Sequence, residues 1–119
     1  MATSERWEVR LYETTHGRTP VLDFLTDLPA KHRAKVRQAI ERLELFGPRL
    51  PFPDSSAVKG TEFRELRTRF AGQQYRVLYL QDGEAFILFD AFHKTSDRDL
   101  DRAVREANKH LADYRSEQS

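Results

Sequence analysis

VKGTEFRELRTRFAGQQYRVLYLQDGEAFILFDAFHKT, residues 58–95, is the stretch that decides the fold. Three runs rich in β-branched and aromatic residues lie end to end in it, separated by Ala71-Gly72 and Asp82-Gly83. Glycine after a small or acidic residue favours a tight hairpin, because such a turn needs a positive φ that glycine adopts without steric cost. We therefore expect three antiparallel strands, at about residues 62–70, 74–81 and 84–93.

Arginine is concentrated at the polar positions of these strands. Four arginines fall on the predicted strands and two lysines flank them, namely Arg64, Arg67, Arg69, Arg76, Lys59 and Lys94. Arg67 and Arg76 lie on either side of the first glycine turn, so antiparallel pairing brings them near each other. Guanidinium groups suit phosphate because their planar fork offers paired donors. A solvated strand face, in which Glu62 and Glu65 form cross-strand pairs with the arginines, has about equal support from spacing alone.

The bulk composition indicates one small domain whose net charge creates no strong overall electrostatic field. A chain of 119 residues is long enough for one modest core, so we expect a single domain over residues 1–119. The formal net charge is +1, from 20 Lys and Arg against 19 Asp and Glu. Residues 31–49 and 59–76 are locally basic, and residues 97–119 are slightly acidic. Attraction for a polyanion must therefore come from local patches.

Several classes of site are excluded by residues that the sequence lacks. It has no Cys, which rules out disulfides, thiolate metal sites and a thiol nucleophile. Its five Gly form no phosphate-binding loop, and no pair of His has metal-ligand spacing, so we expect neither a metal nor another cofactor. The longest apolar run, Ala85–Phe89, is far below the roughly 20 residues that span a bilayer. Because the N-terminus also lacks a signal-peptide core, we expect a cytoplasmic protein without a membrane partner.

The N-terminal residues predict a strand followed by a helix. Apolar residues alternate from Trp7 to Leu11, which is the period of a half-buried strand near residues 7–13. Thr19-Pro20 is a favourable helix start, since Pro lacks only an N–H that the first turn leaves unpaired. The apolar residues after it predict a helix over 19–28.

The same reasoning predicts two more helices and a loop. Spaced apolar residues indicate a basic helix over 31–46, which Gly47-Pro48 closes. Residues 49–57 contain Pro and Ser and predict a loop. Ser96 begins a capping pattern for a C-terminal helix, whose last residues, 115–119, we expect to be frayed. This helix should dock through Leu100, Val104, Ala107 and Leu111, and the core should include Val36, Leu66, Val77 and Ile87.

The order of elements is strand, helix, helix, strand, strand, strand, helix. This order predicts an α+β fold with a twisted, mainly antiparallel sheet. The two N-terminal helices should pack on one face of the sheet, and the C-terminal helix should dock separately.

Two further side chains near the basic cluster are candidates for proton transfer. Histidine changes charge near neutral pH, and His93 is the only histidine next to the cluster. Strand alternation puts His93 and Lys94 on opposite faces unless the strand ends or bulges there. Tyr79 is the best candidate among the tyrosines, because it closes the run that begins at Tyr75. In the ordinary alternative, His93 is only a polar strand-end residue and Tyr79 a core or rim aromatic.

The element order and three segments resemble the RelE/HigB-like toxins of bacterial and phage toxin–antitoxin modules, especially the phage-derived HigB-like branch. These segments are VKGTEFRELRTRF, QQYRVLYL and AFILFDAFHKTSDRDLDRAVREA. The resemblance covers about residues 7–112. Its most specific parts are Glu65-Leu66-Arg67, Tyr75-Arg76-Val77-x-Tyr79, and Phe92-His93-Lys94-Thr95 leading into a helix with Ala103 and Arg105.

The resemblance implies a small endoribonuclease that cuts mRNA, usually on the translating ribosome, and that a cognate helix-turn-helix antitoxin neutralises. It also implies a basic active face made of Lys59, Arg67, Arg76 and Lys94. The branch often has a second Lys where this chain has His93, so His93 takes over a charge role, transfers protons or is a bystander. The acidic start of the last helix, with Asp97, Asp99 and Asp101, lies close to this face in sequence.

The implied chemistry needs no metal, because the 2′-OH of RNA can attack the adjacent phosphate. Fixed Arg and Lys stabilise the charge that grows on the phosphoryl oxygens, and Lys59, Arg64 and Arg69 are expected to bind RNA. Lys59, Lys94, Tyr79 and His93 remain open as general acid or base. The alternative is a non-catalytic module on the same fold, a degenerate toxin that binds RNA or its antitoxin.

Overall fold

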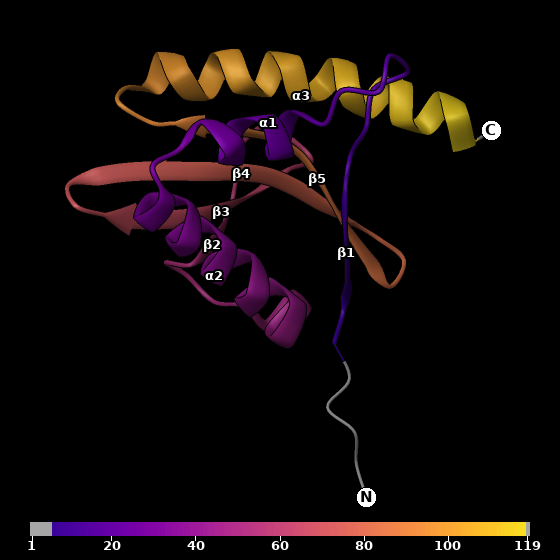
Figure 1. The fold of residues 1–119 in the computed structure, drawn as a ribbon. Helices are drawn as coiled ribbons and strands as arrows, with labels where there is room; N and C mark the ends of the chain where they lie inside the picture. The colour runs from indigo at the N-terminus through magenta and orange to yellow at the C-terminus, as the bar shows by residue number, and fades with distance from the viewer. Residues whose placement is uncertain (1–5, 119) are drawn as a thin grey trace, which may run out of the picture.

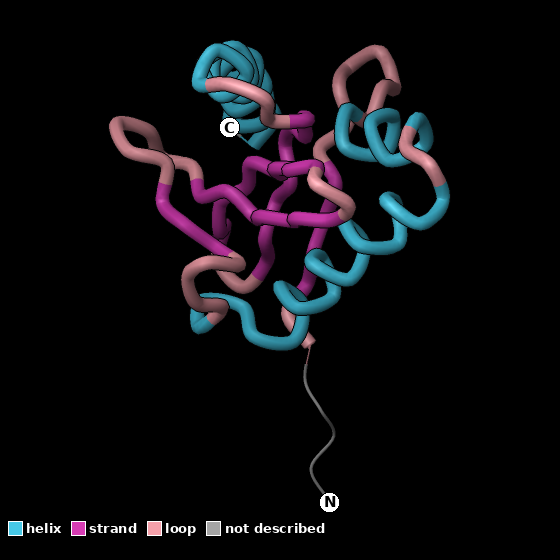
Figure 2. The backbone as a smooth tube through the Cα atoms, turned by 90° about the vertical axis from the view of Figure 1, so that its left-hand side faces the viewer, coloured by secondary structure: helices cyan, strands magenta, loops and turns pink. Residues whose placement is uncertain are grey.

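A five-stranded mixed sheet in the order β1-β5-β4-β3-β2 lies at the centre of the computed structural model, which describes residues 6–118. Its strands are β1 (Glu8–Leu11), β2 (Ser55–Ala57), β3 (Arg64–Phe70), β4 (Gln73–Asp82) and β5 (Ala85–His93). The helices are α1 (Pro20–Asp27), α2 (Ala30–Phe46), a short 3₁₀ helix (Gly47–Arg49) and α3 (Asp97–Gln118). Figure 1 and Figure 2 show α3 on one side of the sheet and α1 with α2 on the other, which confirms the expected α+β fold.

The three predicted hairpin strands are β3, β4 and β5, and both of their pairings are antiparallel. Ala71 and Gly72 both have positive φ, 51° and 78°, as a two-residue turn between right-twisted strands requires. The tight turn fixes the register, so that residues on either side of it become direct cross-strand partners. β1 adds to the edge of β5 in the parallel direction and makes the sheet mixed.

Side chains of the sheet alternate between two apolar cores. On one face, Tyr75, Val77 and Tyr79 of β4 pack with α1 and α2, whereas Leu78 on the other face packs beneath α3. The expected core residues Val36, Leu66, Val77 and Ile87 are all buried. Of the expected docking residues of the last helix, Ala107 and Leu111 are buried in the core beneath α3, and Leu100 and Val104 are partly buried and pack against it.

A β-bulge in β5 changes the alternation of that strand. Leu78 pairs with Asp90 and Tyr79 pairs with Leu88, so Phe89 is the extra residue. Phe89 and Asp90 consequently both face α3, where Phe89 joins the core and Asp90 contacts a helix side chain. Uninterrupted alternation of side chains from Ile87 would assign each later residue of β5 to one face of the sheet. Because of the bulge, each residue of β5 after Phe89 lies on the other face.

Two expectations about element boundaries are wrong. Residues 55–57, expected in a loop, form β2, because they pair with residues 64–66 of β3. Residues 115–118, expected to be frayed, are helical, and Ser119 lies outside the described residues. The Arg115 guanidinium lies 2.6 Å from the carboxylate of Glu62, and this ion pair ties the last turns of α3 to the loop before β3.

None of the helices in residues 6–118 combines the length and the apolar character that crossing a membrane requires.

Candidate functional site

Arg67 and Arg76 are direct partners in the β3–β4 pair. Both fall on the sheet face that α3 shares, since their neighbours Leu66 and Val77 point into the core under α1 and α2. Arg69, two residues after Arg67 on β3, lies on the same face of the sheet. The structure therefore brings together the two arginines that the glycine turn predicted to be close.

Arg76 is buried, with a side chain that is only 2% exposed. Its Nη2 donates to Gln74 Oε1 at 2.8 Å, and its Nη1 donates to the carbonyl oxygen of Tyr75 at 3.3 Å. Its Nε lies 3.1 Å from Glu65 Oε1, an ion pair, but no acceptor in the described chain is aligned for a hydrogen bond with this N–H. Burial lowers the pKa of Arg76 from its ordinary value, and the nearby charge of Arg67 adds to this effect.

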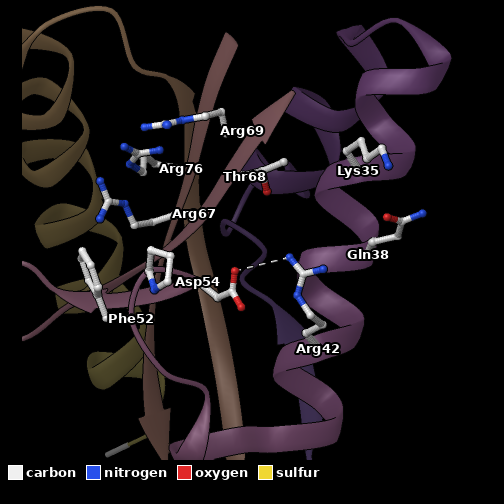
Figure 3. A pocket seen from close by; sticks show the side chains of 10 residues that line it. Lys35, Gln38, Arg42, Phe52, Asp54, Arg67, Thr68, Arg69 and Arg76 are labelled. Atoms are coloured by element: carbon white, nitrogen blue, oxygen red, sulfur yellow. Dashed lines mark ion pairs between the residues drawn. The ribbon is translucent and has the colours of Figure 1, made fainter. Parts of the chain in front are cut away.

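A cavity of about 480 Å³ opens beside this arginine pair, at the edge of β3 (Figure 3). β2 covers that edge only as far as Leu66, and the Arg67 N–H then donates to the carbonyl oxygen of Asp54 at 2.8 Å. Beyond this point the edge of β3 is open. The lining residues are Lys35, Gln38, Arg42, Phe52, Pro53, Asp54, Arg67, Thr68, Arg69 and Arg76.

The charge of this cavity is strongly positive. Five of its lining residues are Lys or Arg and only Asp54 is acidic. The Asp54 carboxylate lies 3.7 Å from Arg42, across the cavity floor in Figure 3. Arg42 Nε is buried and, like Arg76 Nε, has no aligned acceptor in residues 6–118. On one side of the cavity, Arg76 Nε thus faces Glu65, and on the other the 42% exposed side chain of Arg42 faces Asp54.

Lys94 is connected to Arg76 through Gln74. The Lys94 N–H donates to the Gln74 carbonyl oxygen at 2.8 Å, while the Gln74 side chain accepts from Arg76. The Lys94 side chain is 25% exposed, and its Nζ lies 3.9 Å from Asp97 Oδ1. A small hollow at this point is lined by Gln74, Lys94, Thr95, Ser96 and Asp97.

The acidic start of α3 is largely committed to capping that helix. Asp99 Oδ2 accepts hydrogen bonds from the backbone N–H groups of Thr95 and Ser96 and from the Thr95 hydroxyl. The Thr95 bonds lower the pKa of Asp99. Asp97 is the acid of this segment that reaches toward Lys94.

Two of the candidate residues lie on the opposite face of the sheet from Arg76. Tyr79 is only 2% exposed, belongs to the core under α1 and α2, and its hydroxyl lies 2.5 Å from Ser55 Oγ. His93 packs its ring on Tyr75 at a centroid distance of 5.3 Å. The bulge in β5 explains this position, because it reverses which face His93 occupies and brings Lys94 to the basic face instead.

Lys59 and Arg64, two of the expected RNA contacts, do not line the cavity. Lys59 is exposed in the turn between β2 and β3. Arg64 Nε donates to Ser55 Oγ at 3.0 Å, on the face of α1 and α2. Arg69 is the expected RNA-binding residue that lines the cavity.

The α2 wall of the cavity and Phe52 are the parts that sequence reasoning missed. The basic character of helix 31–46 is visible in the sequence, but its periodicity does not reveal that Lys35, Gln38 and Arg42 face the open edge of β3. Phe52 stands in the segment expected to be a loop, and it is 71% exposed.

A comparison with known proteins places the chain in a family. No curated protein and no solved structure matches it. The family model described as phage derived protein Gp49-like (DUF891) matches residues 23–116, which include every residue that lines the cavity. The chain therefore belongs to the phage-derived Gp49-like family, a toxin-like family of toxin–antitoxin systems.

Proposed function

We propose that this protein is the toxin of a RelE/HigB-like toxin–antitoxin module and that it cuts mRNA at the Arg67–Arg76 pair. The observation that carries this proposal is the position of the buried Arg76 guanidinium, directly opposite that of Arg67 and lining the same cationic cavity. A purely structural strand face would pair each arginine with an acid. Arg76 has Glu65, but Arg67 forms no ion pair within residues 6–118.

In the proposed reaction, the 2′-OH of one nucleotide attacks the phosphorus of the next phosphate. The 2′-oxygen–phosphorus bond forms, the bond from phosphorus to the 5′-oxygen breaks, and the products are a 2′,3′-cyclic phosphate and a 5′-OH end. Arg67 and Arg76 hold the nonbridging oxygens, and their hydrogen bonds strengthen as negative charge develops there. The attacking hydroxyl loses its proton to solvent.

Lys94 is the group that we assign to the leaving 5′-oxygen. It is an ammonium whose backbone N–H bonds to Gln74, the residue whose side chain accepts from Arg76, and it lines the neighbouring hollow with Gln74. Donation of a proton from Nζ neutralises the leaving oxygen as the bond to phosphorus breaks. A dedicated general base is less important if the ribosome orients the mRNA, since orientation alone supplies several kcal/mol.

The proposed partners are mRNA, the ribosome and a cognate helix-turn-helix antitoxin. The cationic cavity offers complementary charge to an acidic segment of such an antitoxin, which would speed association and make it salt-sensitive. An antitoxin over this cavity would exclude RNA from both arginines and so suppress toxicity.

A non-catalytic RNA- or antitoxin-binding module is the second candidate. It is favoured by the position of the titratable groups, because Tyr79 and His93 both face away from the arginine pair. Asp97, 3.9 Å from Lys94, also places an acid near the proposed phosphate site.

Induced expression distinguishes the two candidates. We expect wild-type protein to arrest growth and to produce mRNA fragments with 2′,3′-cyclic phosphate ends, mapped by primer extension and end-specific ligation. Co-expression of an adjacent helix-turn-helix gene should restore growth. Intact mRNA during growth arrest would contradict the nuclease assignment and support the binding module.

A further inference from the structure

We infer that Phe52 is a stacking platform for an unpaired base, so that the cavity takes single-stranded RNA with the phosphates of adjacent nucleotides on its two walls. This inference rests on the proposed RNA substrate and adds a positioning residue to it. Phe52 does not touch the scissile phosphate. It holds the nucleotide next to that phosphate.

The exposure of Phe52 is the first observation. Phe52 is 71% exposed, against 46% or less for the other exposed large apolar residues of the described chain. Burying a Phe side chain stabilises a fold, and at Phe52 the fold lacks most of this stabilisation. An aromatic ring held open beside a charged cavity, rather than turned inward, is the arrangement of single-strand-binding proteins.

The contact with Arg67 is the second observation. The Arg67 guanidinium lies over the Phe52 ring, 5.5 Å from its centroid. Such a cation–π contact fixes the ring beside the guanidinium that is assigned to the scissile phosphate. A nucleotide whose phosphate binds Arg67 therefore carries its base, or that of its neighbour, onto Phe52. Every base has a π face, so this contact positions RNA without selecting a sequence.

The opposite wall supplies the third observation. Lys35, Gln38 and Arg42 project from α2 into the same cavity, across from Phe52 and Arg67 (Figure 3). The Arg42 side chain is 42% exposed and its Nη2 lies 3.7 Å from Asp54 Oδ1, so its guanidinium is the group on this wall that can meet a second phosphate. A bent single strand can present one phosphate to each wall. A duplex would keep its bases stacked inside the helix and away from Phe52.

A binding measurement with uncleavable RNA tests this inference. The probes are a short, fluorescently labelled 2′-O-methyl single strand and the same strand with abasic sites, titrated by fluorescence anisotropy. We expect Phe52→Ala to weaken binding of the ordinary strand about tenfold, which is the scale of losing one base stack. We expect it to leave the abasic strand unaffected, and Phe52→Trp to bind like wild type.

Phe46→Ala is the matched control, because Phe46 is also an exposed phenylalanine but does not line the cavity. It should bind both strands like wild type. Equal affinities of Phe52→Ala and Phe46→Ala would overturn the inference, as would an equal loss on the abasic strand. A wild type that binds an acidic peptide but no RNA would also overturn it and would assign the cavity to a protein partner.

The outcome is separable from that of the proposed nuclease. Wild-type protein that binds the 2′-O-methyl strand through Phe52 but leaves cellular mRNA intact would support this inference and contradict the nuclease. Wild-type protein that cleaves mRNA, with Phe52→Ala unchanged in affinity and cleavage, would contradict this inference alone.

Discussion

Arg67 and Arg76 occupy directly opposite positions on β3 and β4, so two guanidinium groups share one cross-strand site. Like charges in this arrangement destabilise a sheet by a few tenths of a kcal/mol to about 1 kcal/mol. Glu65 compensates Arg76, but no carboxylate in the described chain pairs with Arg67. The sheet thus keeps an unfavourable pair where a bound phosphate would relieve it.

Arg67→Gln should therefore raise stability while abolishing function. We expect the free energy of unfolding to rise by roughly 0.5 kcal/mol as the repulsion disappears. We expect mRNA cleavage to fall about a hundredfold or more, the scale of losing one donor to a developing oxyanion. Urea unfolding and primer extension on cellular mRNA measure the two effects.

The matched control is Arg37→Ala, which removes an exposed positive charge from α2 outside the cavity. It should change neither stability nor cleavage appreciably. If Arg67→Gln arrests growth as efficiently as Arg37→Ala, the arginine pair does not hold the scissile phosphate.

Glu65→Gln should destabilise the protein strongly, because it leaves the buried charge of Arg76 without its carboxylate. Breaking one side of a buried ion pair costs about 3 kcal/mol. Combining it with Arg76→Met should restore most of this loss, since both charges are then removed. Urea unfolding of the two single variants and the double variant gives the coupling energy.

Glu62→Gln is the surface control for this cycle. Glu62 also pairs with an arginine, Arg115, but both side chains are more than half exposed and water screens the pair. Its loss should be much smaller than that of Glu65→Gln. Equal losses would show that the Glu65–Arg76 pair is not desolvated as the structure indicates.

Asp90 should make stability depend on pH between about 4 and 6. Burial raises its pKa from 3.8 to about 6, although His110 Nδ1, 2.8 Å away, favours the ionised form and Glu106 opposes it. The folded state therefore holds a proton that the unfolded chain releases in this range, so stability falls as pH rises. A pKa difference of about two corresponds to roughly 3 kcal/mol.

Comparison with Asp90→Asn isolates this effect. The stability of wild type minus that of Asp90→Asn should decrease from pH 4 to pH 6 and then level off. Thermal or urea unfolding at each pH gives the difference. A difference that stays flat or increases over this range would mean that Asp90 is ionised in the folded state at pH 4.

Arg33→Ala should weaken α1 rather than RNA binding. Its guanidinium donates to the carbonyl oxygens of Leu25, Thr26 and Leu28, at 2.8, 3.3 and 2.8 Å, and thereby satisfies the C-terminal end of α1. Its removal should cost about 1–3 kcal/mol. Melting curves should show this loss, whereas the affinity for uncleavable RNA should match wild type. Weakened RNA binding by a fully folded Arg33→Ala would instead extend the RNA site to α1.

The hairpin strands and the helices were predictable because their determinants are local. Glycine at Gly72 and Gly83 fixes two turns, and apolar periodicity marks the helix faces. The pairing of Arg67 with Arg76 follows from the length of the first turn. β2 was missed because its Ser-Ser-Ala sequence has no strand pattern, and its strand geometry comes from pairing with β3.

The site was only partly predictable, because its remaining features are not local. The bulge at Phe89 cannot be read from a continuous apolar run, yet it decides whether His93 or Lys94 joins the arginines. The α2 wall depends on how that helix lies against β3, which is a tertiary relationship. Sequence spacing therefore identified the sheet half of the cavity and missed the helix half.

Proton transfer can be assigned by mutation, because the bulge in β5 places Lys94 on a different face of the sheet from His93 and Tyr79. Lys94→Ala should lower mRNA cleavage strongly, because Lys94 is connected to Arg76 through Gln74 and is assigned to the leaving oxygen. His93→Ala and Tyr79→Phe should cleave like wild type, since both side chains lie on the other face. Tyr79→Phe should cost only about 1 kcal/mol of stability, from the lost hydrogen bond to Ser55.

Lys94→Arg then distinguishes a proton donor from a fixed charge. Arginine keeps the positive charge but gives up a proton far less readily, so cleavage by this variant should stay close to that of Lys94→Ala if Lys94 protonates the leaving oxygen. Activity near that of wild type would assign Lys94 a purely electrostatic role. Loss of cleavage in a stably folded His93→Ala, with Lys94→Ala active, would place the proton-transfer group on the face of α1 and α2 and overturn the assignment of the active face.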